Sequence, residues 1–490
     1  MANIGLNRKG VDMKHLQPEK ASEMSRREFL QSVGATAGGI AISSNSVMAA
    51  ALAKGKTGQQ KGITTVRGAF VYPASEKLRG GWWSWPGIDF DAEGRQKQYM
   101  RRIKGMQQNL AMRISMDEKP LDAKATVTQF INEVKQSKPD GLLLIPFKHS
   151  HFGHIDSILK EVKIPTVILL SLGVKHGPVN QYRRPGVYLI SSLDNLDAVE
   201  YGMRMIRTAR WMKESRIISV AGSAEPKEQI VPHLGTKVRV VPIKRFVDEV
   251  KGIEITDEVE QLARAFIKNA KKILEPAEPE IIAAARVHFA IKRILETEKG
   301  DAVMMDCLRR GELMPCMSFM TFRDEGIAAG CENDLNATLT LMLVQQLFDR
   351  PGFQHNPGFE TEKNHYFAAH CTSASKLFGT TKPAEPYLLR NFAHTNDPTC
   401  VPQVLWREGK EVTMAHYLSG ETPRMLVYSG KVVKSYAMPP VGGCRTNVEI
   451  TVNELENADD VKGHHNVLFY GNYAKQLRIF CQLYGINVVT

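Results

Sequence analysis

The sequence has no CxxC pair, and none of its seven cysteines precedes residue 300. An odd number of cysteines without paired spacing argues against a dense disulfide framework and against a four-ligand structural zinc site. Most of them are expected to be small, buried apolar side chains. One disulfide is compatible with the sequence, but the spacing does not choose its partners. The cysteines are Cys307, Cys316, Cys331, Cys371, Cys400, Cys444 and Cys481.

Long apolar runs and blocks of like charge are also missing. No internal run is long and uncharged enough to cross a bilayer. The formal net charge is +12 over 490 residues, but the excess is spread along the chain. Nucleic-acid binding needs a clustered basic stripe, so we expect no nucleic-acid partner. With 43% hydrophobic residues, the chain can bury a large core, and its length suggests two or three domains.

The N-terminus combines paired arginines with a mild apolar stretch, 25-SRREFLQSVGATAGGIAI-42, and small residues follow at 49–53. This order is typical of a cleavable export signal of the twin-arginine type. The alternative is a disordered basic tail. We predict a signal over residues 1–53, export by the twin-arginine machinery, and a periplasmic or secreted protein. That route carries folded proteins, often with a cofactor already loaded.

After a polar linker over residues 54–61, short β-rich runs alternate with helical patterns. Several runs are continuously apolar, as in parallel strands that are buried on both faces. The pattern predicts an α/β fold with two doubly wound parallel-sheet domains, residues 62–190 and 191–382. Turn residues at short spacing then predict an antiparallel, β-rich C-terminal domain, 383–490. The main predicted strands are 63–72, 141–147, 164–171, 187–190, 216–222 and 301–306, and the main predicted helices are 123–137, 257–274 and 279–300.

The stretch 330-GCENDLNATLTLML-343 places two acids before a long apolar helix. Asp334 or Asn333 can cap the helix by accepting from its first free amide groups. Acids at helix starts are usually caps, and this explains Asp334. Glu332 precedes the cap, so capping does not explain it, and it remains a candidate for a catalytic or ligand role.

Four histidines that could bind a metal ion together with Glu332 occur downstream, in loops or at strand ends. One carboxylate and two imidazoles from separate segments would form an open site for Mn²⁺, Fe²⁺ or Zn²⁺. The alternative is that each is a hydrogen-bonded core residue. The candidates are His355, His370, His464 and His465.

The segment 323-RDEGIAAGCENDLNATLTLML-343 resembles the Glu-Asn-Asp metal loop of the L-fucose isomerase and L-arabinose isomerase superfamily. The ending 463-GHHNVLFYGNYAKQLRIFCQLYGINVV-489 is similar to the arabinose isomerase terminus. Close resemblance covers about 300–377 and 463–489. It implies that Glu332 is both a metal ligand and a catalytic residue, and that further metal ligands are His370 and either His465 or His464.

One departure from the family pattern lies in 353-FQHNPGF-359. The family has a second metal-binding carboxylate there, whereas this chain has His355 and Asn356, with no acid until Glu360. Asn cannot accept a proton at neutral pH. Asn356 could still be a metal ligand, and His355 or Glu360 could act as the base. Alternatively, isomerase activity is lost.

Further residues are candidates for sugar binding. Trp83 and Trp85, in 80-GGWWSWPG-87, could stack on a sugar, although a tryptophan cluster is more often core or interface. His149 or His151 follows a predicted parallel strand, where α/β folds bind ligands. The resemblance implies that such a histidine reaches substrate, often across a subunit interface, and hence a homo-oligomer. A zinc site and an ordinary polar loop are alternatives there. Asn333 is a further candidate for substrate contact.

The resemblance implies an exported sugar isomerase with a divalent metal cofactor, Mn²⁺ being favoured. Aldose–ketose interconversion removes a carbon-bound proton beside a carbonyl, and a divalent ion on the sugar oxygens would stabilise the enediolate. A base positioned to take up that proton increases the reaction rate by about 10²–10⁴-fold. Two alternatives are a non-catalytic sugar-binding or sensing protein and a glycoside-cleaving enzyme, because fold does not settle function.

Overall fold

The computed structural model describes residues 61–490, except 75–89, 172–173, 175–178, 194, 224, 309, 311–312, 395–396 and 437–443. All described residues fall within one compact unit of the chain. The predicted export signal, linker residues 54–60, Trp83 and Trp85 lie outside the described residues. No helix in the described part of the chain is long and apolar enough to cross a membrane.

Sheet A has five parallel strands in the order β2-β1-β3-β4-β5. The apolar run of β3 is buried at every position, as expected for a strand covered on both faces. β2 was not predicted, because it has only four residues and so carries little periodic signal. The bounds are β1 Thr65–Val71, β2 Arg113–Met116, β3 Gly141–Pro146, β4 Thr166–Ser171 and β5 Val187–Ser192.

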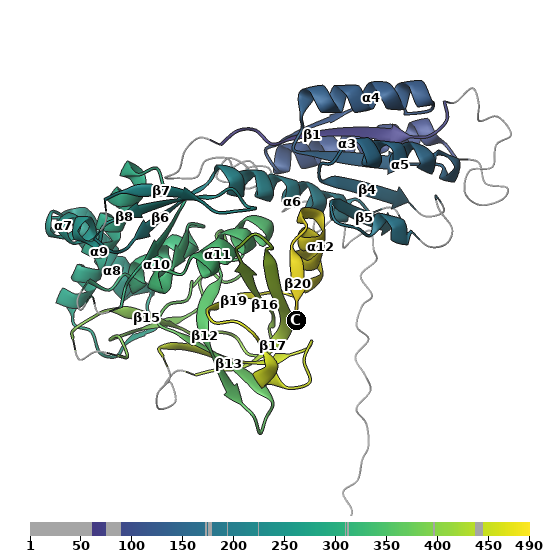
Figure 1. Ribbon diagram of the computed structural model, residues 1–490. Coiled ribbons are helices and arrows are strands. Elements are labelled where there is room, and N and C mark those ends of the chain that lie inside the picture. The colour runs from purple at the N-terminus through teal and green to yellow at the C-terminus, as the bar shows by residue number, and fades with distance from the viewer. Residues whose placement is uncertain are drawn as a thin grey trace, which may run out of the picture. The chain divides into compact units, whose positions relative to one another are not determined.

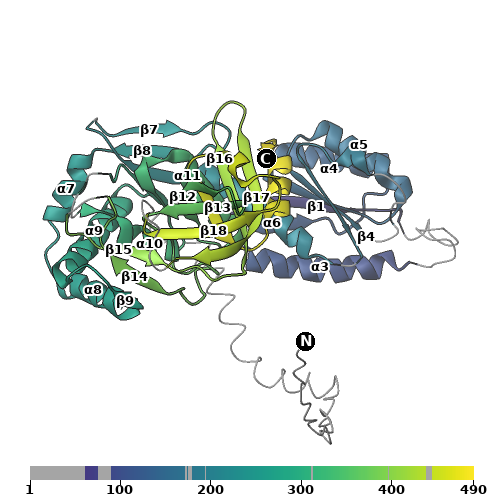
Figure 2. The ribbon, with the colours of Figure 1, turned by 90° about the horizontal axis from the view of Figure 1, so that it is seen from below.

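Helices cover both faces of sheet A. Figure 2 shows α4 (Lys124–Ser137) and α5 (Phe152–Glu161) on one side of β1 and α3 (Ala92–Asn109) on the other. The side chains of β3 alternate between the two resulting cores. Leu142 and Leu144 pack with α4 and α5, whereas Leu143 and Ile145 pack with α3 and α6 (Asp197–Glu214).

Sheet B has the order β11-β10-β6-β8-β7, parallel except for β7. Helices α7, α8 and α9 gather beside β6 and β8 (Figure 1) and share their core with α10. The predicted helices 257–274 and 279–300 correspond to α8 and α9, but α8 ends at Asn269 and the last predicted residues include the short strand β9 (Lys272–Ile273). The bounds are β6 Arg216–Val220, β7 Lys227–Ile230, β8 Lys237–Val241, β10 Ala302–Met305, β11 Ala328–Gly330, α7 Ile243–Lys251, α8 Asp257–Asn269, α9 Glu278–Thr297 and α10 Cys316–Asp324.

Sheet D is a seven-stranded, barrel-like sheet in the order β16-β19-β12-β13-β18-β17-β20, and β16 also pairs with β17. It is antiparallel apart from the β17–β20 pair. The predicted β-rich C-terminal region is therefore present. The bounds are β12 Phe353–Glu360, β13 His365–His370, β16 Glu411–Leu418, β17 Arg424–Ser435, β18 Thr446–Val452, β19 Asn466–Tyr470 and β20 Asn487–Val489.

Sheet D begins at β12, before the predicted boundary at residue 383. The segment that forms β12 and β13, FQHNPGFETEKNHYFAAH, is rich in polar residues and contains Pro357 and Gly358. It therefore lacks the regular apolar alternation that marks a strand. A small sheet C contains β9 Lys272–Ile273, β14 Tyr387–Arg390 and β15 Val401–Val404, and α12 spans Ala474–Tyr484.

Helix α11 (Leu335–Phe348) joins sheet B to sheet D, since it contacts β10 and β11 on one side and β16 and β19 on the other. The helix is apolar almost all round and nearly every residue is buried, as expected for a helix enclosed between layers. The loop that precedes it leaves the carboxyl end of β11, the edge at which parallel sheets commonly bind ligands.

Gly330 allows the start of α11 to approach β11. A Cβ at this position would lie 1.9 Å from Thr338 Oγ1, and that hydroxyl donates to the Asp334 carbonyl at 2.6 Å. Gly330→Ala should therefore displace the first turn of α11 and lower the free energy of unfolding by about 1–3 kcal/mol, as measured by chemical denaturation.

The matched control is Gly153→Ala in α5, where an added Cβ meets nothing within 4 Å. Alanine is the better helix former, so this variant should be as stable as the parent or slightly more so. Equal stability of the Gly330 and Gly153 variants would show that the β11–α11 junction is not closely packed.

Candidate metal centre

The loop between β11 and α11 holds two consecutive residues in the left-handed region, Glu332 (φ 57°) and Asn333 (φ 53°). Such conformations cost about 1–3 kcal/mol each and persist only where the surroundings fix them. Here Gln354 Oε1 accepts from the Cys331 amide at 2.8 Å, and Asn333 Oδ1 accepts from Ser219 Oγ at 2.8 Å. The loop is therefore fastened from both sheets, with Glu332 in the middle.

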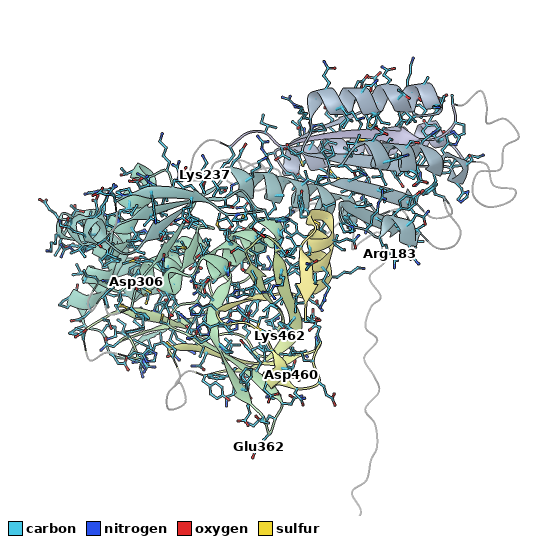
Figure 3. The ribbon with its side chains drawn as sticks, viewed as in Figure 1. Arg183, Lys237, Asp306, Glu362, Asp460 and Lys462 are labelled. Atoms are coloured by element: carbon cyan, nitrogen blue, oxygen red, sulfur yellow. The ribbon has the colours of Figure 1, made fainter. Side chains whose placement is uncertain are left out.

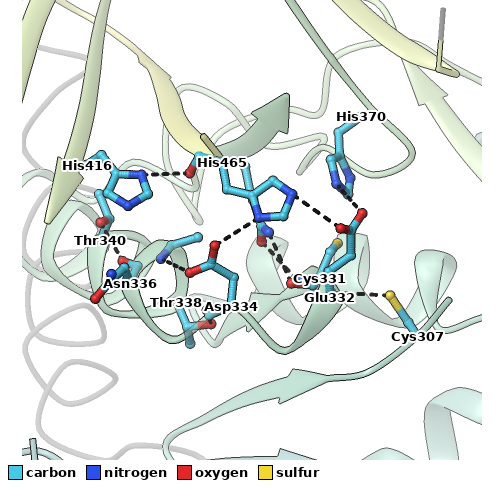
Figure 4. A network of polar contacts seen from close by, with 12 residues as sticks. Cys307, Cys331, Glu332, Asp334, Asn336, Thr338, Thr340, His370, His416 and His465 are labelled. Carbon is cyan, nitrogen blue, oxygen red and sulfur yellow. Dashed lines mark hydrogen bonds and ion pairs between the residues drawn. The ribbon is translucent and has the colours of Figure 1, made fainter. Parts of the chain in front are cut away.

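Three predicted residues from distant segments converge at this loop (Figure 4). His370, at the end of β13, has Nε2 3.2 Å from Glu332 Oε1. His465, directly before β19, has Nε2 3.5 Å from Glu332 Oε2. One ligand atom from each residue lies within 4.8 Å of the others. We call Glu332, His370 and His465 the triad.

The triad places a carboxylate between two nearly buried imidazoles. His370 and His465 are 2% and 3% exposed, whereas the Glu332 side chain is 26% exposed. His370 and then His465 hold the pKa of Glu332 well below its usual range, although burial opposes this. Burial lowers the pKa of His370, but Cys371 and Glu332 raise it, and the net value is about 10. Glu332 is thus ionised, and one side of it remains accessible.

The donor set fits a divalent cation. His465 Nε2 is buried and has no hydrogen-bond partner in the described part of the chain, although it faces Glu332. A buried polar atom without a partner is costly, and a cation shared with Glu332 would satisfy it. Two imidazoles and one carboxylate leave coordination positions open, as in catalytic sites for Fe²⁺ or Zn²⁺.

Asp334 supports the triad and also begins the helix. Its Oδ1 accepts from the Ala337 amide at 2.8 Å, which confirms the predicted helix cap. Its Oδ2 lies 2.9 Å from His465 Nδ1, so the other ring nitrogen of His465 is turned toward Glu332. A carboxylate behind a metal-binding histidine fixes the ring and increases its basicity. This second role was missed, because no local pattern connects Asp334 with His465.

The other candidates are not members of the triad. His464 is exposed and stands beside His465, with ring centroids 4.3 Å apart. His355 is fully buried, its nitrogens lie 3.1 Å from Phe353 O and 3.0 Å from the Tyr366 hydroxyl, and burial lowers its pKa to about 3. It is therefore a hydrogen-bonded core residue.

Asn356 and Glu360 lie further along β12. Asn356 is opposite Ala369, and its Oδ1 is buried without a hydrogen-bond partner among the described residues. Glu360 is opposite His365 at the hairpin end, near Lys363 at 4.0 Å. His365 lies five residues before His370 on β13, a span of roughly 16 Å, so Glu360, which is opposite His365, lies away from the triad.

The candidates for sugar contact are less directly connected. His149 and His151 do follow β3, as predicted, in a single turn of 3₁₀ helix. His151 Nδ1 lies 3.0 Å from Ser150 Oγ, and among the described residues no hydrogen bond or ion pair joins either histidine to the triad. Their role in sugar binding remains a prediction. Asn333 uses its amide oxygen to hold the loop.

No protein-family model matches the chain, and no curated protein is significantly similar to it. The resemblance to the fucose and arabinose isomerases therefore rests on the motif residues.

Asp334→Asn separates the two roles of this residue. Asparagine is an equally good helix cap, so the free energy of unfolding should change by less than about 0.5 kcal/mol. Its neutral side chain supports His465 less well, so divalent-metal affinity should fall about 10–100-fold. Isothermal titration with Mn²⁺, Fe²⁺ and Zn²⁺ measures this. Unchanged affinity together with unchanged stability would show that Asp334 is only a cap.

Proposed function

We propose that this protein is an exported, metal-dependent sugar isomerase that interconverts an aldose and a ketose. The observation that carries the proposal is the convergence of Glu332, His370 and His465 from three separate segments on one partly open position. The loop resemblance supports the same reaction class. We further propose Mn²⁺ as the ion, twin-arginine export and a homo-oligomer.

We also infer that the α/β units are doubly wound. In support, the strand order β2-β1-β3-β4-β5 is one of the two common doubly wound orders, and separate cores line the two faces of sheet A. Such sheets bind ligands at the carboxyl ends of their strands. The triad loop leaves that end of sheet B.

The residues have distinct roles in the proposed reaction. Glu332, His370 and His465 would hold the cation, which supplies positive charge where the enediolate develops. Asp334 fixes the His465 ring through Nδ1. The exposed part of Glu332 marks the side from which a sugar approaches, since both imidazoles are buried.

The proton carrier comes from outside the triad in this proposal. Both oxygens of Glu332 face imidazoles, and its lowered pKa suits a ligand better than a base. Asn356 cannot accept a proton, and the His355 nitrogens face Phe353 and Tyr366. Of the four histidines downstream of Glu332 that were candidates for this site, His464, exposed beside His465, is the one left to carry the proton.

Two alternative functions have different support. A sugar-binding or sensing protein without turnover is favoured by Asn356, which stands where the family has an acid. Glycoside cleavage needs a pair of carboxylates flanking the bond. Asp334, the acid closest to Glu332 in sequence, already serves Ala337 and His465. Glycoside cleavage therefore has less support.

Glu332→Gln tests the proposal. The neutral amide cannot offset a cation, so Mn²⁺ affinity should fall by more than about 100-fold and turnover of pentoses, 6-deoxyhexoses and hexoses should be lost. The control is Glu362→Gln, an exposed residue at the β12–β13 hairpin tip (Figure 3), which should behave as the parent. Metal uptake and sugar-dependent thermal stabilisation without turnover in the parent would support the binding alternative.

His464→Gln tests the proton carrier separately. Glutamine keeps a polar side chain but cannot cycle a proton, so kcat should fall about 10²–10⁴-fold. Bound metal, measured by elemental analysis, should be unchanged, because His464 is outside the triad. A variant that loses metal and activity together would instead identify His464 as a ligand.

A further inference from the structure

Five of the seven cysteines form a contiguous group next to the triad, which we call the thiol cluster. The Cys331 thiol interacts with those of Cys307 and Cys371, and the Cys371 thiol also interacts with those of Cys316 and Cys444. Four of the five are buried and Cys444 is half-buried. These residues come from five separate segments, so their convergence is a property of the fold.

The centre of the thiol cluster has metal-binding geometry. The sulfurs of Cys331 and Cys371 and one His370 nitrogen all lie within 4.8 Å of one another, and Cys371 Sγ is 3.3 Å from His370 Nδ1. His370 faces Glu332 through its other nitrogen, Nε2. The three residues are at most 5% exposed, so this position is shielded from water, unlike the Glu332 side of the ring.

A buried positive charge adjoins the same position. Arg323 is 2% exposed, and its guanidinium donates to the carbonyls of Ala329 and Thr372 and, at 3.6 Å, to Cys331 Sγ. Among the described residues, no carboxylate is hydrogen-bonded to or ion-paired with Arg323. Buried charges are normally paired, and Cys331 is the ionisable side chain that this guanidinium contacts.

We propose that Cys331, Cys371 and His370 Nδ1 form a binding site for a soft, thiophilic cation of the Cu⁺ type. Sulfur and imidazole ligands in a dry site favour such ions over Mn²⁺ or Mg²⁺. Binding releases three protons to solvent, one from each of the two thiols and one from His370 Nδ1, and involves no oxidation or reduction. Two thiolates and one monovalent cation carry a net charge of −1, which the Arg323 guanidinium balances.

Charge and coordination number argue against Zn²⁺ as the preferred ion. With Zn²⁺ the two thiolates would form a neutral complex and leave the Arg323 charge without a partner. Structural zinc also prefers four protein ligands, whereas three residues meet the distance limit here. This site goes beyond the proposed isomerase function, since it uses the opposite nitrogen of His370 and needs no sugar.

The experiment titrates the full mature chain with Cu⁺ under anaerobic, reducing conditions against a colorimetric Cu⁺ chelator. The parent should retain a single Cu⁺ per chain in this competition, and Zn²⁺ should not displace it. Cys331→Ser and Cys371→Ser should each lower Cu⁺ affinity by more than about 100-fold. Cys481→Ser, a buried cysteine in α12 outside the thiol cluster, is the matched control and should bind like the parent.

Two further measurements keep the test decisive. X-ray absorption of the Cu⁺-loaded parent should show sulfur and nitrogen atoms bound to copper. This measurement uses the parent protein, so it does not depend on any variant folding. Glu332→Gln should retain Cu⁺ while losing Mn²⁺, so failure of the soft site and failure of the triad are distinguishable. The proposal is overturned by a parent that yields all Cu⁺ to the chelator, by an oxygen- and nitrogen-only shell, or by a disulfide at Cys371 in peptide mapping of the protein as isolated.

Discussion

The two hydrogen bonds of the Asp334 carboxylate are the interaction on which the candidate site depends. One oxygen begins α11 by accepting from Ala337, and the other holds His465. Helix α11 is enclosed between sheet B and sheet D. This one side chain therefore holds the loop after β11 in place against sheet D. The hydrogen bonds with Gln354 and Ser219 stabilise the left-handed conformations of Glu332 and Asn333 in the same loop. Glu332 is therefore already placed between the two imidazoles.

His370 connects two chemically different environments. Its Nε2 faces a partly exposed carboxylate, and its Nδ1 faces a dry group of thiols. Oxygen and imidazole ligands on one side suit harder divalent ions, whereas sulfur ligands on the other suit soft ones. Occupation of one side would alter the proton and charge distribution of the ring on the other. The two proposed sites are therefore coupled through one side chain, even though they take different ions.

Much of the secondary structure of the α/β part could be predicted from the sequence, because apolar runs and helical periodicity are local patterns. Apolar runs such as GLLLIP, now β3, and helices with clear periodicity, such as α8 and α9, were located within a few residues. β2 was missed because it is only four residues long, and the β12–β13 hairpin was missed because polar residues interrupt its pattern. Glu332, His370 and His465 were selected from motif resemblance and meet in space. The pairing of Asp334 with His465, the engagement of His355 by Tyr366 and the clustering of the thiols depend on long-range packing. Local sequence does not encode these contacts.

The central claim is that Glu332, His370 and His465 hold one divalent cation. A crystal structure of the mature protein grown with Mn²⁺, with anomalous diffraction recorded at the manganese edge, tests it most directly. The account predicts an anomalous peak within bonding distance of the Glu332 carboxylate and of Nε2 on both His370 and His465, with open coordination on the exposed side. A peak elsewhere, or none at saturating Mn²⁺ while the three side chains keep their present positions, would contradict it.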